Sequence, residues 1–238
     1  MTESNVRIVL LDIEGTTTPI DFVYQTLFPF VRRNLEQFLL RQISTASVRE
    51  DIAALRVECE MEFAQSGQSP QWSDSDIESA VRHALWLMDQ DRKSTALKAL
   101  QGRIWEEGYL SGELHGIVFG DVPRAFERWK VEGRKIAIYS SGSILAQKLI
   151  FGHSNAGDLT RFIDSYFDTT TGPKREAESY RRIAGAMGIA ASEVLFYSDV
   201  TAELDAARAA GMQTALCVRD GGTVTADDHP VVTTFDII

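Results

Sequence analysis

The chain has 238 residues, of which 44% are hydrophobic and 24% are charged, a composition that excludes a disordered or low-complexity protein. Its net charge is -10, and a protein this acidic lacks the clustered cationic surface that nucleic acid or anionic lipid requires. We therefore expect no nucleic-acid partner and no membrane. The first five residues contain no basic region, and the apolar stretch that begins at Val6 is interrupted by Asp12, so it is too short for a signal peptide or a membrane span. Cys59 and Cys217 lie far apart in apolar surroundings, which argues against a disulfide. A cytoplasmic protein with two reduced, buried cysteines is expected.

The chain begins with a predicted strand and continues with predicted helices. Residues 8–11 are a run of branched apolar residues, which predicts a strand buried on both faces. From residue 19 to residue 115, apolar residues recur at helical spacing instead. Two such helical faces are Ile52, Leu55, Cys59 and Phe63, and Ile77, Val81, Leu85 and Met88. Two pairs have capping-box spacing, Ser47 with Glu50 and Ser75 with Glu78, and a loop is predicted over residues 65–71.

Strands and helices alternate in the second half of the chain. Apolar runs predict strands at residues 136–139, 194–197 and 215–218. A helix is predicted before each of them: one capped by Asp121 and ended by Gly133, one from about Tyr180 to Gly188, and one from Thr201 to Gly211. This alternation predicts an α/β fold with a Rossmann-like parallel sheet. The simplest organisation is a core of residues 1–18 and 116–238, with an all-helical cap of residues 19–115 inserted after the first strand.

An acid pair directly follows the first predicted strand. Asp12 and Glu14 lie at the edge of the sheet where open α/β folds bind ligands. Two carboxylates this close repel each other unless a cation or a shared proton separates them, and Mg²⁺ is the natural cation. Taken alone, the pair is explained as well by a turn with an Asx hydrogen bond. The motifs of a P-loop, a dinucleotide site and a hydrolase nucleophile elbow are absent, and the four histidines lack metal-ligand spacing.

Polar residues at three further positions are expected at the same edge. Ser140 and Ser141 follow the predicted strand at 136–139, where hydroxyls and a helix N-terminus form an anion site. Asp199 follows the strand at 194–197, and Lys174 precedes a helix and supplies a positive charge. Each feature alone has an ordinary explanation, such as a helix cap or a solvated lysine. Together they provide what phosphoryl transfer requires, namely a carboxylate nucleophile, an acid/base, Mg²⁺ and donors around phosphate.

The order of these residues along the chain resembles the four motifs of the haloacid dehalogenase superfamily. One position departs from that pattern, because the superfamily usually has Asp where this chain has Glu14. This departure and several longer segments are similar to the bifunctional enolase-phosphatase family of methionine salvage. The segments are DIEGTTTPI at residues 12–20, DRKSTALK at 91–98, YSSGS at 139–143 and SDV at 198–200.

The resemblance implies a haloacid dehalogenase-type core with a helical cap, and a specific reaction. The substrate would be the small molecule 2,3-diketo-5-methylthiopentyl 1-phosphate, enolised and then dephosphorylated by a monomeric enzyme. Asp12 would be the nucleophile and Glu14 the acid/base. Ser140, Ser141 and Lys174 would bind the phosphate, and Glu203 would orient the metal shell. One Mg²⁺ per subunit would be held by Asp12, Glu14 and Asp199.

Two other functions remain open from the sequence. A sugar-phosphate phosphatase or mutase of the same superfamily would share Asp12 and Asp199 and differ in the cap. A phospho-acceptor module without turnover also places acids and a lysine around Mg²⁺, although the order of elements argues against it. The base that removes the carbon-bound proton during enolisation is not identified by any motif.

Overall fold

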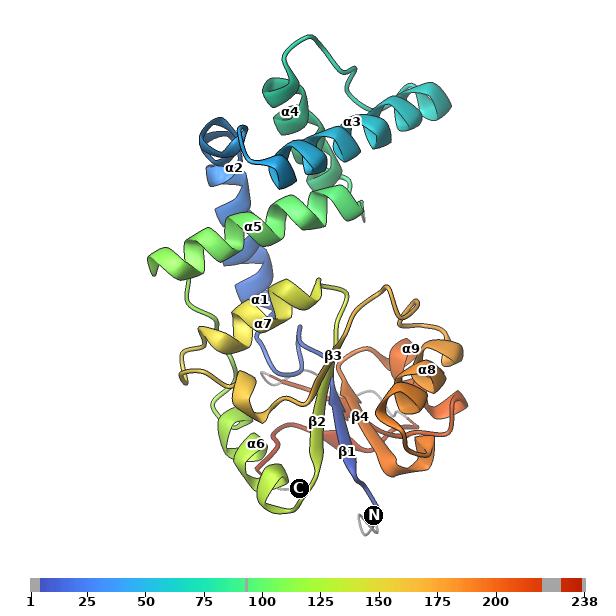
Figure 1. The fold of residues 1–238 in the computed structure, drawn as a ribbon. Helices are drawn as coiled ribbons and strands as arrows, with labels where there is room; N and C mark the ends of the chain where they lie inside the picture. Colours follow the sequence, from blue (N-terminus) through green and yellow to red (C-terminus); the bar gives the residue numbers. More distant parts are fainter. Residues whose placement is uncertain (1–4, 93, 220–227, 237–238) are drawn as a thin grey trace. The chain divides into compact units, whose positions relative to one another are not determined.

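A computed structural model of the chain describes residues 5–92, 94–219 and 228–236 (Figure 1). Two parts of the sequence used above lie outside the described residues. They are residues 1–4, on which the absence of a basic N-terminal region partly rests, and Lys93 of the segment at 91–98. The chain divides into two compact units, Met1–Val23 with His115–Ile238, and Tyr24–Leu114. This division falls five residues after the predicted boundary at residue 18 and one residue before the predicted end of the cap at 115.

The first unit is built on a parallel sheet. Its described strands have the order β3-β2-β1-β4-β5-β6, and every pairing between them is parallel. Their bounds are β1 Ile8–Leu11, β2 Lys135–Tyr139, β3 Ser165–Phe167, β4 Val194–Ser198, β5 Gln213–Cys217 and β6 Val231–Val232. The α/β fold with a parallel sheet is therefore confirmed. Since β1 lies between β2 and β4, the strand order reverses beside it, and open sheets bind their ligands at such a point.

Helices cover both faces of this sheet (Figure 1). The helices of this unit are the short α1 Ile20–Phe22, α6 Val122–Val131, α7 Ile144–Gly152, α8 Ala177–Met187 and α9 Thr201–Ala209, with 3-10 turns at Thr160–Phe162 and Ala191–Glu193. Local signals explain their ends: Ser143 caps α7 by accepting from the Ala146 amide, and Gly188 ends α8 at a φ of 70°. Asp121 is the N-cap residue of α6, as predicted, but its side chain makes no cap hydrogen bond and accepts from Arg219 instead.

Buried side chains fill the space on each side of the sheet. On one face, Tyr180 and Ile183 of α8 and Leu204 of α9 pack with Leu10 and Phe196. The other face carries an aromatic group in which Phe126 contacts Trp129, Phe151 and Phe162, and Trp129 stacks on Tyr197. The alternation of Phe196 and Tyr197 between the two faces follows from the two-residue period of a strand.

The second unit contains helices and loops, and no strand within its described residues. It contains the π-helical turn Val23–Leu27, which crosses the boundary, and α2 Phe28–Gln42, α3 Ala46–Ser66, α4 Asp76–Asp89 and α5 Thr95–Ser111. The Trp105 indole of α5 donates to the Leu27 carbonyl, which fixes α5 to the turn before α2. The predicted loop is confirmed, although α3 extends to Ser66 before it. No helix of the described residues combines the length and apolar character needed to cross a bilayer.

The helices predicted from the two apolar stripes are α3 and α4. The stripe of α4 at 77, 81, 85 and 88 is partly buried, and its most buried residues are Ser79, Ala80, His83, Ala84 and Leu87. The predicted capping boxes are absent, because Thr45 precedes α3 and the Ser75 side chain makes no cap hydrogen bond. Both cysteines are buried and free, as expected.

The aromatic group predicts a large effect of removing one ring. Phe126→Ala should lower the free energy of unfolding by about 3 kcal/mol, because the fully buried ring leaves a cavity among three aromatic neighbours. Val131→Ala in the same helix is the control, since that side chain is 88% exposed and should change stability by less than about 0.5 kcal/mol. Urea denaturation measures both. Equal unfolding midpoints for the two variants would contradict the packing described here.

Candidate active site

The segment after β1 is a tightly bonded loop. The amides of Thr16, Thr17 and Thr18 all donate to the Ile13 carbonyl, and the Asp12 amide donates to the Tyr197 carbonyl of β4. The Thr17 hydroxyl donates back to the Asp12 carbonyl at 3.1 Å. These bonds fix the backbone on both sides of the Asp12 side chain, which is 3% exposed.

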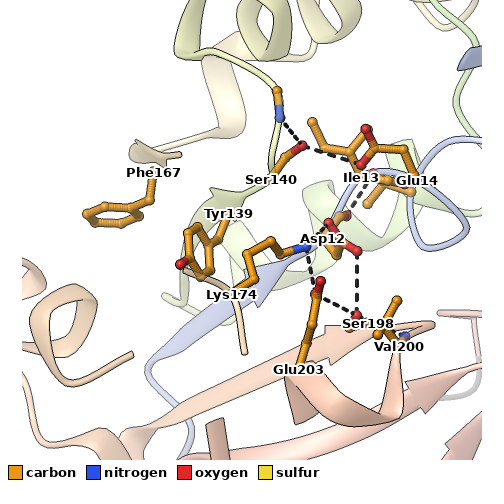
Figure 2. Close-up of polar contacts among 12 residues, drawn as sticks. Asp12, Ile13, Glu14, Tyr139, Ser140, Phe167, Lys174, Ser198, Val200 and Glu203 are labelled. Carbon is orange, nitrogen blue, oxygen red and sulfur yellow. Dashed lines mark hydrogen bonds and ion pairs between the residues drawn. The ribbon is translucent and has the colours of Figure 1, made fainter. Parts of the chain in front are cut away.

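A lysine joins two carboxylates beside this loop (Figure 2). The Lys174 Nζ atom lies 2.6 Å from Asp12 Oδ1 and 2.6 Å from Glu203 Oε2, and all three side chains are at most 11% exposed. Because solvent does not compete at such a depth, these charge-assisted hydrogen bonds are strong and directional. Lys174 and Asp12 lie 162 residues apart in the chain, so the fold itself produces the contact.

Ser198 connects the same carboxylates from below in Figure 2. Its hydroxyl lies 3.4 Å from Asp12 Oδ2 and 3.2 Å from Glu203 Oε2, and it also accepts from the Val200 amide. No role is predicted for Ser198 from the sequence, and only an orienting role is predicted for Glu203. The available signal was their position, since Ser198 ends β4 and Glu203 lies in the first turn of α9.

Two tyrosines hold Lys174 in place. The Tyr180 hydroxyl donates to the Lys174 carbonyl at 2.7 Å, and the ammonium lies 5.8 Å from the centre of the Tyr139 ring. The preceding Gly172 has a φ of 150°, and a Cβ there would lie 2.3 Å from the Ser179 hydroxyl oxygen. Only glycine therefore lets the chain turn closely against α8 and bring Lys174 to the sheet edge.

The predicted serine loop lies on the other side of the acid pair. Ser140, which is 1% exposed, has its hydroxyl 3.3 Å from Glu14 Oε2 and accepts from the Gly142 amide. Ser141 follows in the same loop, which leads into the N-terminus of α7. Gln147 fixes this loop by donating to the Gly142 carbonyl. Hydroxyls and amides before a helix N-terminus provide donors for an anion.

The carboxylates of the site perturb one another. Burial, and then the charge of Asp12, raise the pKa of Glu14, raise that of Asp199 to about 6 and raise that of Glu203 to about 7. Asp199 lies directly against the loop after β1, because a Cβ on Gly15 would come within 2.2 Å of its Oδ2 atom. The site thus concentrates negative charge, which a bound cation relieves.

These residues fit Mg²⁺. Their donors are all oxygen atoms, which Mg²⁺ prefers, and several acids lie close together at one sheet edge. Within the described residues, no three His, Cys, Asp or Glu side chains are arranged as a metal site. A cation here would therefore also use a main-chain carbonyl and water, and Mg²⁺ ordinarily keeps several waters.

The chain is similar to known proteins along nearly its whole length. A family model for haloacid dehalogenase-like hydrolases matches residues 6–211. An enolase-phosphatase E1 of Synechococcus elongatus is 51% identical over 233 residues, which cover 98% of this chain and 97% of that protein. An enolase-phosphatase E1 of Pseudomonas aeruginosa is 48% identical and covers 98% of each chain. The crystal structure of the UTR4 protein of Saccharomyces cerevisiae is similar with a TM-score of 0.80 and 35% identity, covering 98% of this chain and all of that one.

The raised pKa of Glu203 predicts that the free energy of unfolding depends on pH. Because its folded-state pKa is raised, the folded protein keeps a proton that the unfolded chain has already released, so stability falls as pH rises between the two pKa values. In metal-free protein, wild type should lose stability relative to Glu203→Gln from about pH 5 to about pH 7, by up to about 1.4 kcal/mol per pH unit. Urea denaturation of both proteins across this range measures the difference. A difference that does not vary with pH would contradict the raised pKa.

Proposed function

The chain belongs to the haloacid dehalogenase-like hydrolases and, within them, to the enolase-phosphatase E1 family, and on that premise we propose its reaction. It enolises 2,3-diketo-5-methylthiopentyl 1-phosphate and hydrolyses the phosphate ester, giving phosphate and the acireductone 1,2-dihydroxy-3-keto-5-methylthiopentene of L-methionine salvage. The observation that carries this proposal is 51% identity over 98% of the chain, which includes the helical unit as well as the sheet. A sugar-phosphate phosphatase or a phospho-acceptor module would share the residues at the sheet edge. Neither would be expected to resemble an enolase-phosphatase along the whole chain, including the helical unit.

Asp12 is the nucleophile of the phosphoryl step. Its carboxylate oxygen attacks phosphorus, and the bond between phosphorus and the ester oxygen breaks, which leaves an aspartyl-phosphate. Lys174, which already donates to Asp12, and the hydroxyls of Ser140 and Ser141 bind the phosphoryl oxygens as charge develops on them. Support for this assignment comes from the position of Asp12 at the end of β1, where loops and helix N-termini converge.

Glu14 is the acid and base of the same step. It gives its proton to the ester oxygen that leaves, and it then takes a proton from the water that attacks the aspartyl-phosphate. Its raised pKa supports this role, because burial and the charge of Asp12 favour the protonated form that a general acid must supply. The hydrogen bond from Ser140 orients this carboxyl.

One Mg²⁺ per subunit completes the site. Asp12, the main-chain carbonyl of Glu14 and Asp199 would hold it, with the Glu14 carboxylate as a further candidate donor and with Glu203 orienting the shell around it. When bound, it neutralises negative charge on the phosphoryl oxygens. Magnesium dependence is typical of the family, which supports this part of the proposal. The Lys174 ammonium would also stabilise an enediolate formed in the enolisation step.

We assign the catalytic core to residues 1–18 and 116–238, and the cap, which would select the diketo phosphate, to residues 19–115. The division of the chain into Met1–Val23 with His115–Ile238 and Tyr24–Leu114 supports this assignment. The enzyme works as a monomer in the cytoplasm on this small substrate, with neither nucleic acid nor a membrane as a partner. The net charge of -10 supports the last point.

Replacing the nucleophile tests the reaction directly. Asp12→Asn should lower phosphate release at least about 1000-fold, because the amide is a poor nucleophile and a weaker metal ligand. The assay incubates enzyme with the diketo phosphate anaerobically and follows acireductone absorbance and free phosphate together. Asp158→Asn is the control, since this exposed carboxylate accepts only local bonds from Thr160. Phosphate release by Asp12→Asn within about tenfold of wild type would refute the nucleophile assignment.

A second substitution separates the two chemical steps. If Glu14 acts only in phosphoryl transfer, Glu14→Gln should still enolise the diketo phosphate, and the phosphorylated enol should accumulate without phosphate release. Solvent deuterium should enter the substrate carbon under the same conditions. Loss of both enol and deuterium exchange, in a variant that still binds Mg²⁺, would instead assign Glu14 to the carbon-bound proton as well.

A further inference from the structure

A buried arginine outside the proposed machinery contacts the loop that carries the nucleophile. Arg219 lies two residues after β5, and its side chain is 8% exposed. Its Nε and Nη2 atoms donate to the Thr16 carbonyl at 3.1 and 2.9 Å. This paired donation to one carbonyl uses the planar geometry of the guanidinium, which a lysine lacks.

The other side of the guanidinium is also fixed. Its Nη1 atom donates to Asp121 Oδ2 at 2.7 Å and to the Thr233 carbonyl at 3.1 Å. The ring centres of Phe119 and Phe235 lie 4.6 and 4.4 Å from the guanidinium carbon. These contacts hold the Arg219 side chain in one conformation, so its two hydrogen bonds to the Thr16 carbonyl also fix the position of that carbonyl.

Asp121 is in turn held by several donors. Besides Arg219 it accepts from the Thr234 hydroxyl at 3.0 Å and from the Phe235 amide at 2.6 Å. Burial alone would raise the pKa of Asp121, but these donors and the positive charge of Arg219 lower it overall. The result is a buried ion pair anchored to α6 and to the C-terminal segment.

The loop after β1, which this ion pair contacts at Thr16, is closely packed on both sides of that residue. Thr16 is fully buried, and the neighbouring Thr17 carbonyl accepts from the Phe119 amide at 3.0 Å. On the other side of Thr16, Gly15 lies against Asp199 so closely that a Cβ would overlap its carboxylate. A shift of the Thr16 carbonyl would therefore change the spacing between Asp199 and the loop that begins at Asp12.

We propose that Arg219 is a positioning residue that holds the loop after β1, and with it Asp12 and Glu14, in the reactive conformation through the Thr16 carbonyl. Asp121 orients Arg219 for this purpose. The effect on catalysis rests on the proposed phosphatase reaction, whereas the effect on the loop does not. Catalytic groups must be held to a fraction of an ångström, so a small displacement lowers turnover without removing any reacting group.

Arg219→Lys tests the proposal with the charge retained. Because an ammonium cannot make the paired donation to Thr16 while also binding Asp121 and Thr233, kcat should fall at least about tenfold, and KM should stay within about threefold. Arg124→Lys is the matched control, since Arg124 also bonds to the C-terminal segment through Asp236 but is 62% exposed, and its kcat should be unchanged. Methylguanidinium at millimolar concentration should restore part of the activity of Arg219→Ala. A lower melting temperature with unchanged kcat in Arg219→Lys would show a merely structural role and overturn the proposal.

Hydrogen exchange of the loop separates this inference from the proposed function. In substrate-free protein, the amides of Thr16, Thr17 and Thr18 should exchange at least about tenfold faster in Arg219→Lys than in wild type or Arg124→Lys. Unchanged exchange would overturn the inference whatever the reaction. If exchange rises while wild type releases no phosphate from the diketo phosphate, the proposed function fails and the positioning of the loop stands.

Discussion

The contact of Lys174 with Asp12 and Glu203 is the interaction on which the site depends. At 2.6 Å from each carboxylate, the ammonium offsets charge that burial would otherwise make unfavourable. Burial, and then the charge of Asp12, raise the pKa values of the remaining acids, Glu14 and Asp199. A bound cation would relieve this concentration of negative charge at the sheet edge, and the Lys174 ammonium with the donors of the serine loop would attract an anionic phosphate.

The parallel sheet creates this concentration because it gathers distant parts of the chain. The ends of β1 and β4 carry Asp12 and Ser198 side by side, as their pairing requires. Glycine at position 172 lets Lys174 approach, and Arg219 after β5 fixes the loop from the far side of β4. Residues at the ends of β1, β4 and β5 thus meet at one edge of the sheet, which is why substitution of Arg219, which is not a reacting group, is expected to affect turnover.

Much of this arrangement could be predicted from the sequence, and the exceptions have physical reasons. The strand at 8–11 was evident because both of its faces are buried, whereas β3 and β6 were missed because they are short and only partly buried or exposed. The superfamily order of acids, serine and lysine predicted the site residues. Arg219 was missed because a single arginine after a strand has no distinctive pattern, and its partners Thr16 and Asp121 are set by tertiary structure.

The central claim is that the Asp12 carboxylate, held by Lys174, is the group that takes the phosphoryl from the substrate. Rapid acid quench during turnover of the diketo phosphate, followed by borohydride reduction and peptide mapping, tests it most directly, because reduction converts an aspartyl-phosphate to homoserine. Homoserine is expected at position 12 in wild type quenched during turnover, and none is expected in enzyme quenched without substrate. Unmodified Asp12 in enzyme that is releasing phosphate, or reduction at Glu14 instead, would contradict it.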